Sequence, residues 1–346
     1  MSTSGLQNIA KHFRAKGEWF FNTNGITTLI MSAVFIFFIC FVDYLVPSQQ
    51  LIPPYIKHIM VMCLVFAVLS MSLNFVSGYI GQTSLGHAAF FGMGAYVTGI
   101  LTKDMGWNYW PAFLLAGIVS ALVGIPLAAP ALRVKGGFLV VITYGFGEVF
   151  RYIAINTDAT GGPAGMPGIP TPVFFKDFTE MGPTGKEAYI IFGFILIAFL
   201  AYFMHKMEKS RTGYAFAAIR EDEIAATAMG INVNYYKMLA FVLAAFFGGL
   251  AGSMYVGYSR FVSPEMLASD QSIYILTMVI VGGARSIKGS ILGAALLVIM
   301  PEAFRVLKDL IGISFDPWLV FYGFILIVMM RVRPQGFWGK TSLFTK

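Results

Sequence analysis

Long apolar stretches alternate with short polar or Gly- and Pro-containing segments along nearly the whole chain. Within each stretch the apolar residues are continuous and do not alternate with polar ones, which predicts helices and not strands. In lipid, only helices and closed barrels satisfy all of their backbone polar groups. We therefore predict an all-α, polytopic membrane helix bundle of about ten spans, several of them short or broken. The expected spans are residues 26–46, 57–77, 86–102, 109–129, 137–155, 188–205, 237–257, 271–283, 289–301 and 315–330.

The composition supports a membrane location. Of the 346 residues, 57% are hydrophobic and 12% are charged, whereas a soluble domain carries about 25% charged residues. The first apolar run is long enough to cross a bilayer, and no small-residue cleavage site follows it, so we interpret it as a retained span. The two cysteines, Cys40 and Cys63, lie in apolar runs where neither a disulfide framework nor a zinc site is expected.

The distribution of Lys and Arg predicts the orientation. With residues 1–25 placed in the cytoplasm, 16 of the 24 Lys and Arg residues lie inside, 7 lie outside, and Arg151 lies within a span. Cytoplasmic loops of membrane proteins are enriched in these residues. The N-terminal segment 1–25 and the tail 331–346 are thus predicted to be cytoplasmic, with the membrane domain at 26–330 between them. The net charge of +7 reflects this bias, and we infer no nucleic-acid partner from it.

Two polar segments are too long to be simple turns. The outer one, 156–187, is rich in Gly and Pro, and is either a flexible gate or a rigid, turn-rich loop. Its candidate gate residues are Gly161, Gly162, Gly165 and Gly168.

The inner polar segment, 206–237, reads as a helix. Thr212 can cap its start and Gly230 can end it in the left-handed conformation. Many alanines make this helix narrow, and charges cluster from Arg220 to Glu223. It is either a helix that inserts into a groove on a partner or a solvated connector between two spans.

Glycine-rich breaks interrupt two pairs of apolar segments, near 77–87 and 282–289. Interrupted helices at corresponding positions of two halves are typical of a transport pathway. The candidate pathway or hinge residues are Gly81, Gln82, Ser84, Gly86, His87, Gly282, Gly283 and Gly289. A hydrogen-bonded packing role is the alternative for His87.

Glu148 and Arg151 stand three residues apart in the fifth expected span and so share one helix face. Ionisable groups at membrane depth face a bundle interior or a wet cavity and often mark a pathway. The alternative is a structural ion pair near the outer end of the helix.

The sequence contains no motif for catalysis. The string Gly339-Lys340-Thr341 follows Pro334 where a phosphate-binding loop needs Gly, and there is no HExxH pair or GxSxG elbow. We therefore predict a protein that is not itself an enzyme, with no cofactor and no metal.

Several strings in order along the chain carry a family resemblance. They are SGYIGQTSLGHAAFFGMGAY (77–96), TGGPAGMPGIP (160–170), AIREDEIAATAMG (218–230), VGGARSIKG (281–289) and RVRPQG (331–336). With them the chain resembles the larger, LivM-type permease subunit of branched-chain amino-acid ABC importers. Arg285 and Lys288 depart from the pattern, which has smaller residues in this Gly-rich turn.

The resemblance implies a pore-forming subunit in the bacterial cytoplasmic (inner) membrane that works by alternating access. Its implied partners are a second homologous permease, two ATP-binding cassette subunits and an extracytoplasmic amino-acid binding protein. It also implies that the inner helix couples to an ATPase subunit, through Arg220, Glu221, Glu223, Ala225, Ala226 and Gly230. Urea importers have closely similar permeases, so a urea or short-amide importer is an alternative. A stand-alone secondary transporter, with Glu148 titrating in a proton-coupled cycle, is a rival from another class.

Overall fold

The computed structural model describes residues 53–131, 134, 137–172 and 186–311, and near the C-terminus 322–324, 327, 331 and 336–338. The expected span 26–46, most of 315–330, the segment 1–25 and most of the tail lie outside the described residues. The elements are α3 (Pro54–Asn74), η1 (Phe75–Ile80), α4 (His87–Gly99), η2 (Ile100–Asp104), α5 (Tyr109–Ala131), α6 (Gly137–Asn156), η3 (Asp158–Thr160), η4 (Gly162–Ala164), β1 (Met166–Pro167), α8 (Glu187–Glu208), α9 (Arg211–Glu221), α10 (Glu223–Ala228), α11 (Val233–Ser259), β2 (Phe261–Val262), η5 (Pro264–Leu267), α12 (Ser269–Gly282) and α13 (Ile287–Ile311).

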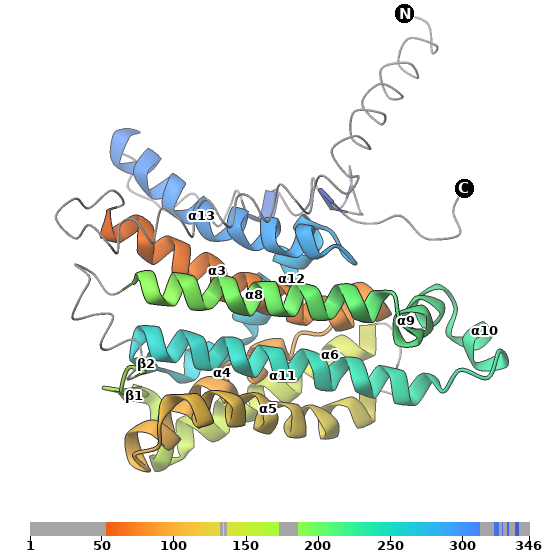
Figure 1. The fold of residues 1–346 in the computed structure, drawn as a ribbon, viewed down its shortest axis with the longest axis horizontal. Helices are drawn as coiled ribbons and strands as arrows, with labels where there is room; N and C mark the ends of the chain where they lie inside the picture. Colours follow the sequence, from red (N-terminus) through yellow and green to blue (C-terminus); the bar gives the residue numbers. More distant parts are fainter. Residues whose placement is uncertain are drawn as a thin grey trace, which may run out of the picture.

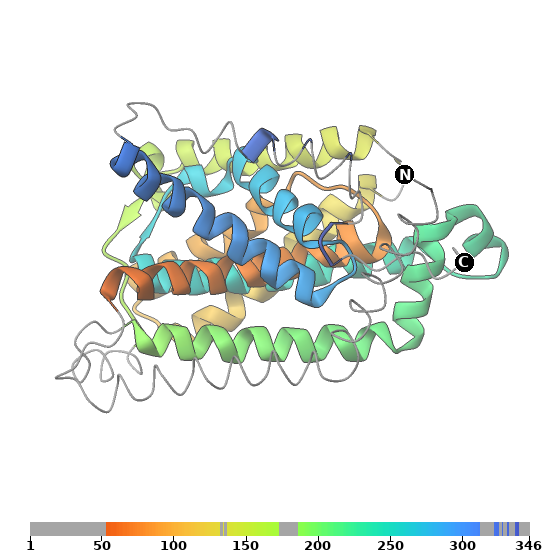
Figure 2. The same ribbon diagram turned by 90° about the horizontal axis from the view of Figure 1, so that it is seen from above.

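The described part is a helix bundle, as the continuous apolar stretches predicted. The long helices α3, α5, α8 and α11 run side by side along the longest axis (Figure 1). The short helices α9 and α10 project from one end of the bundle, and the strand pair β1–β2 lies at the opposite end in both views (Figures 1 and 2). We refer to these two ends as the α9–α10 end and the β1–β2 end.

Helix α11 organises the core, because it packs against α5, α4 and α3. Small residues let α4 approach α11 closely: a Cβ on Gly94 would lie 2.1 Å from the carbonyl oxygen of Gly249. In a membrane, where lipid is as apolar as the helices, such close backbone packing is a main source of helix association. These contacts hold the middle of the bundle.

Six of the described helical segments are long and apolar enough to cross a membrane. They are Pro54–Ile80, Tyr109–Ala128, Gly137–Asn156, Glu187–Glu208, Val233–Ser259 and Ile287–Arg305. The expected span 86–102 corresponds to α4 with η2, and the expected span 271–283 corresponds to α12. Both are shorter than the six segments above. The chain is thus a multi-pass membrane protein, and the count of ten spans stays a prediction.

A buried ion pair closes the β1–β2 end of the bundle. The Lys57 ammonium, at the start of α3, lies 2.5 Å from a carboxylate oxygen of Glu187, at the start of α8, and both side chains are buried. The helices α3 and α8 are far apart in sequence, so this pair fixes their relative position at one end.

Candidate functional site

The first Gly-rich break is a widened helix end followed by an extended loop. Helix α3 continues into the wide π-helical turn η1, which ends at Gly81 with a φ of 79°. Residues 81–86 are not helical, and α4 begins at His87. The break therefore lies where the sequence predicted it, at the α9–α10 end of α3.

The second break lies beside the first. Helix α12 ends at Gly282, Gly283 has a φ of 117°, and α13 begins at Ile287. The buried Asn74 side chain joins the two: its Oδ1 accepts a hydrogen bond from the Arg285 backbone N–H at 3.0 Å, and its Nδ2 donates one to Ser290 Oγ at 2.9 Å. Sequence reasoning missed Asn74, because a single amide in an apolar run carries no motif.

Helices α12 and α13 form a tight hairpin around the second break. A Cβ on Gly282 would lie 2.0 Å from the Gly289 carbonyl oxygen, so the two backbones touch. The Phe337 and Trp338 backbone N–H groups donate to the carbonyls of Val281 and Gly282, at 2.9 and 3.0 Å. The C-terminal chain thus satisfies carbonyls that the end of α12 leaves unpaired.

The inner segment is two helices, not the single one predicted. Asp222 is extended, with φ −156° and ψ 113°, and its Oδ1 accepts hydrogen bonds from the N–H groups of Ile224 and Ala225, so it ends α9 and caps α10. Ser210, not Thr212, is the N-cap residue of α9. Gly230 has a φ of 82°, which agrees with the predicted left-handed end.

This break turns the predicted coupling charges toward the bundle. Arg220 Nη1 donates to the Gly78 carbonyl at 2.7 Å, and Glu223 Oε1 accepts from Lys237 Nζ at 2.6 Å. Burial and the nearby Arg285 guanidinium lower the pKa of Arg220. Arg220 and Glu223 therefore contact the bundle itself, and Ala226 is buried as well.

The same segment also exposes three large apolar side chains among its polar ones. Tyr214, Ile224 and Met229 are 68%, 75% and 83% exposed; we call these three residues the docking patch. The predicted coupling residues Glu221, Ala225 and Gly230 are also exposed. Sequence reasoning missed the patch because a broken helix does not follow a single helical period.

Glu148 and Arg151 form an ion pair on α6. Arg151 Nη1 lies 3.1 Å from Glu148 Oε2, and Ser269 Oγ donates to Glu148 Oε1 at 2.8 Å. Glu148 is the twelfth of the 20 residues of α6, so the pair lies near the middle of this helix and not near its outer end. Of the six long segments, α6 is the least buried within the described bundle.

The residues of the first break, and His87 directly after it, pack onto α6 and the core. A Cβ on Gly86 would lie 2.5 Å from the Thr143 carbonyl oxygen, and Leu85 N–H donates to Thr143 Oγ1 at 3.0 Å. Ser84 is buried. His87 is fully buried, with Nε2 2.7 Å from Ser72 Oγ, a geometry that fits the packing alternative. Gln82 is half-buried, and its Oε1 has no hydrogen-bond partner among the described residues.

The described part of the outer loop, up to residue 172, is ordered by turns. Strand β1 pairs with β2 in antiparallel register, Met166 opposite Val262, and the Ile169 N–H donates to the Arg260 carbonyl. The four candidate gate residues Gly161, Gly162, Gly165 and Gly168 all have positive φ. This geometry favours the turn-rich alternative for 157–172, while 173–185 lie outside the described residues.

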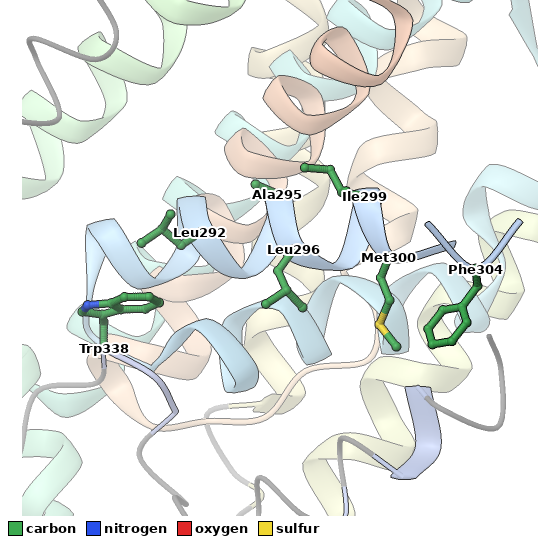
Figure 3. A pocket seen from close by; sticks show the side chains of 7 residues that line it. All are labelled: Leu292, Ala295, Leu296, Ile299, Met300, Phe304 and Trp338. Carbon is green, nitrogen blue, oxygen red and sulfur yellow. The ribbon is translucent and has the colours of Figure 1, made fainter. Parts of the chain in front are cut away.

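An apolar groove runs along α13 (Figure 3). Its lining is almost entirely apolar: Leu292, Ala295, Leu296, Ile299, Met300, Phe304 and Trp338. Such a surface offers nothing to a charged substrate. Among the described residues no cluster of His, Cys, Asp or Glu suits a metal ion.

Comparison with known proteins identifies the family to which this chain is similar. The family model described as the permease component of branched-chain amino acid transport systems matches residues 55–330. The high-affinity branched-chain amino acid transport system permease protein LivM of Salmonella typhimurium is 33% identical over 296 residues, 80% of this chain and 68% of the relative. LivM of Escherichia coli is 32% identical over 79% of this chain and 67% of its own length. The guanosine ABC transporter permease protein NupQ of Bacillus subtilis is 23% identical over 67% of this chain and 74% of its own length.

No solved structure matches the chain. The family model covers most of the chain, and the two LivM relatives are similar over about four fifths of it. The resemblance seen in the sequence motifs is thereby confirmed. The chain belongs to the family of permease components of branched-chain amino acid transport systems.

Proposed function

We propose that this permease is the membrane-spanning subunit of an ATP-driven importer of branched-chain amino acids in the bacterial cytoplasmic membrane. It pairs with a second homologous permease, two ATP-binding cassette subunits bind its cytoplasmic side, and an extracytoplasmic binding protein delivers the amino acid. The α9–α10 end is cytoplasmic, as are both termini. ATP hydrolysis belongs to the separate subunits, because this sequence has no phosphate-binding loop.

The docking patch is the observation that carries this proposal. Ile224 and Met229 lie on a segment that projects beyond the end of the bundle (Figure 1), where a solvated connector has no need of large apolar side chains. Large exposed apolar side chains on a projecting segment are typical of a protein interaction site. An ATPase subunit with an apolar groove is the partner that fits a transport permease.

Alternating access requires that a movement of the docking patch also moves the two helix breaks. Arg220 connects α9 to the Gly78 carbonyl in η1, and Asn74 connects η1 to the second break. When ATP closes the two ATPase subunits, α9 and α10 move with them, and the breaks at Gly81–Gly86 and Gly282–Gly289 act as hinges. A ligand biases such a change only through different affinities for the two states, so we expect a weak, transient substrate site.

The names of the relatives support branched-chain amino acids as the substrate class. NupQ, a more distant relative, is named for guanosine. Substrate screening therefore includes leucine, isoleucine and valine, with guanosine and urea as the competing classes. A stand-alone secondary transporter is the rival proposal, and the docking patch speaks against it because such a carrier has no ATPase to bind.

Co-purification from the native membrane tests the proposal. The wild-type chain is expected to retain two ATPase subunits and a second permease in mild detergent. The double variant Ile224→Asp, Met229→Asp is expected to lower the recovery of the ATPase subunits about tenfold or more, which is the effect of losing a strong interface contact. Asn234→Asp, an exposed polar position nearby on α11, is the matched control and retains the ATPases. A wild-type chain that comes without ATPases contradicts the proposal.

A further inference from the structure

The ion pair on α6 is partly open at a depth where lipid does not accept charge. The side chains of Arg151 and Glu148 are 32% and 19% exposed, although both lie on a helix long and apolar enough to span the membrane. Charged groups at such depth face a wet cavity or another protein surface. The open side of this pair therefore faces the interior of the assembled transporter.

The pair also has unused hydrogen-bonding capacity. Arg151 Nε is buried and has no partner among the described residues, and of the five N–H donors of the guanidinium, only Nη1 makes a hydrogen bond among these residues, to Glu148. Glu148 Oε2 accepts a hydrogen bond from Arg151 and Oε1 accepts one from Ser269 Oγ, with the Ser269 backbone also interacting with this carboxylate, whereas a carboxylate accepts about four. Ser269 holds Glu148 in place even if Arg151 moves away.

We propose that Glu148 and Arg151 form a transient site for a zwitterionic α-amino acid, which binds by partner exchange. The substrate ammonium takes the place of the Arg151 guanidinium at Glu148 Oε2, and the substrate carboxylate accepts hydrogen bonds from the freed guanidinium. This inference rests on the proposed function and names the group that recognises its substrate.

Charge balance gives the site its selectivity. The pair has no net charge and neither does the zwitterion, so the exchange adds no net charge at membrane depth. A ligand that has only the carboxylate or only the ammonium leaves one of the two protein groups without a partner, which is costly in a water-poor site. Urea and nucleosides, which have neither charge, leave both interactions unused.

The neighbouring side chains suit an apolar substrate side chain. Tyr144 and Tyr152 are one turn before and after Glu148 on α6, and both rings are exposed. A branched aliphatic side chain that lies along this face meets aromatic surface on both sides of the charged pair.

Photolabelling tests the site in the intact importer, without its binding protein so that only the permeases select. The probe is a leucine analogue that has a diazirine in its side chain. The labelled peptide is expected to include residues 144–152, and excess leucine is expected to compete about tenfold or more better than N-acetyl-leucine or leucinamide, each of which lacks one charge. Labelling elsewhere, or equal competition by these compounds, overturns the proposal.

Variants separate substrate recognition from a structural role. Glu148→Gln is expected to lower the preference for leucine over its α-hydroxy acid analogue, which lacks the ammonium, and Arg151→Gln is expected to lower the preference for leucine over leucinamide. If Glu148 and Arg151 have only a structural role, the variants change the yield of the complex and leave the preferences between leucine and its analogues unchanged. That result overturns the inference. Wild-type importer that takes up no leucine even with its binding protein would instead contradict the proposed function.

Discussion

Arg220 Nη1 donates a 2.7 Å hydrogen bond to the carbonyl of Gly78. The two residues are 142 positions apart and belong to the projecting helix α9 and to the widened end of α3. The same turn approaches the second break, because a Cβ on Gly78 would lie 2.8 Å from the Arg285 backbone nitrogen. The Arg220 side chain thus connects the segment that bears the docking patch to the first break, and the turn at Gly78 in turn contacts the second break.

Loss of this connection is expected to uncouple transport from ATP hydrolysis. In Arg220→Ala the ATPases still bind, because the docking patch is intact, but uptake per ATP hydrolysed falls about fivefold or more, as expected when a charged hydrogen bond is removed. Arg220→Lys restores part of the coupling. The ratio of leucine uptake to phosphate release in proteoliposomes measures this.

The exposed Arg211, at the start of the same helix, provides the control. Arg211→Ala is expected to keep the wild-type ratio. An Arg220→Ala importer with the wild-type ratio would show that the hydrogen bond plays no part in coupling.

Asn74 is expected to stabilise the two breaks. Asn74→Ala removes the hydrogen bonds that this fully buried side chain makes with Arg285, Ser286 and Ser290, and it should lower the free energy of unfolding by about 1–3 kcal/mol. Thermal unfolding in detergent measures the change. Asn234→Ala, at an exposed position in the first turn of α11, should leave the melting temperature unchanged, and equal melting of both variants would refute this role.

Gly86→Ala tests the close contact between the first break and α6. The added methyl group would lie 2.5 Å from the Thr143 carbonyl oxygen, so the loop or the helix must shift, at a cost of about 1–3 kcal/mol. We expect slower leucine uptake per assembled complex. Gly137→Ala, where no atom lies within 4 Å of the new methyl group, is the control, and identical uptake in both would argue against a tight hinge here.

The buried pair of Lys57 and Glu187 gives a different prediction. Glu187→Gln removes the carboxylate charge that lies 2.5 Å from the buried Lys57 ammonium and should cost about 3 kcal/mol or more, visible as a lower melting temperature. Lys57→Met combined with Glu187→Leu removes both charges and should recover most of that loss. If the double variant melts no higher than the single one, the ion pair does not explain the defect.

Much of the fold could be predicted, because the residues of a membrane-spanning helix must be mostly apolar, and the turns that interrupt such helices here contain glycine. The limits of α6 and α8 agree with their expected spans within a few residues. Residues that act across the bundle could not be predicted in the same way. Asn74 and Ser269 have no local pattern, and the bend at Asp222 reversed the expected direction of Arg220 and Glu223. Which side a coupling charge faces depends on tertiary contacts.

The most direct measurement of the central claim is leucine uptake into proteoliposomes with this chain alone and with its co-purified partners. We predict uptake only when the second permease, the ATPase subunits, ATP and the binding protein are all present, with no response to a pH gradient. Uptake by this chain alone, driven by a pH gradient, would contradict the account and make the chain a secondary transporter.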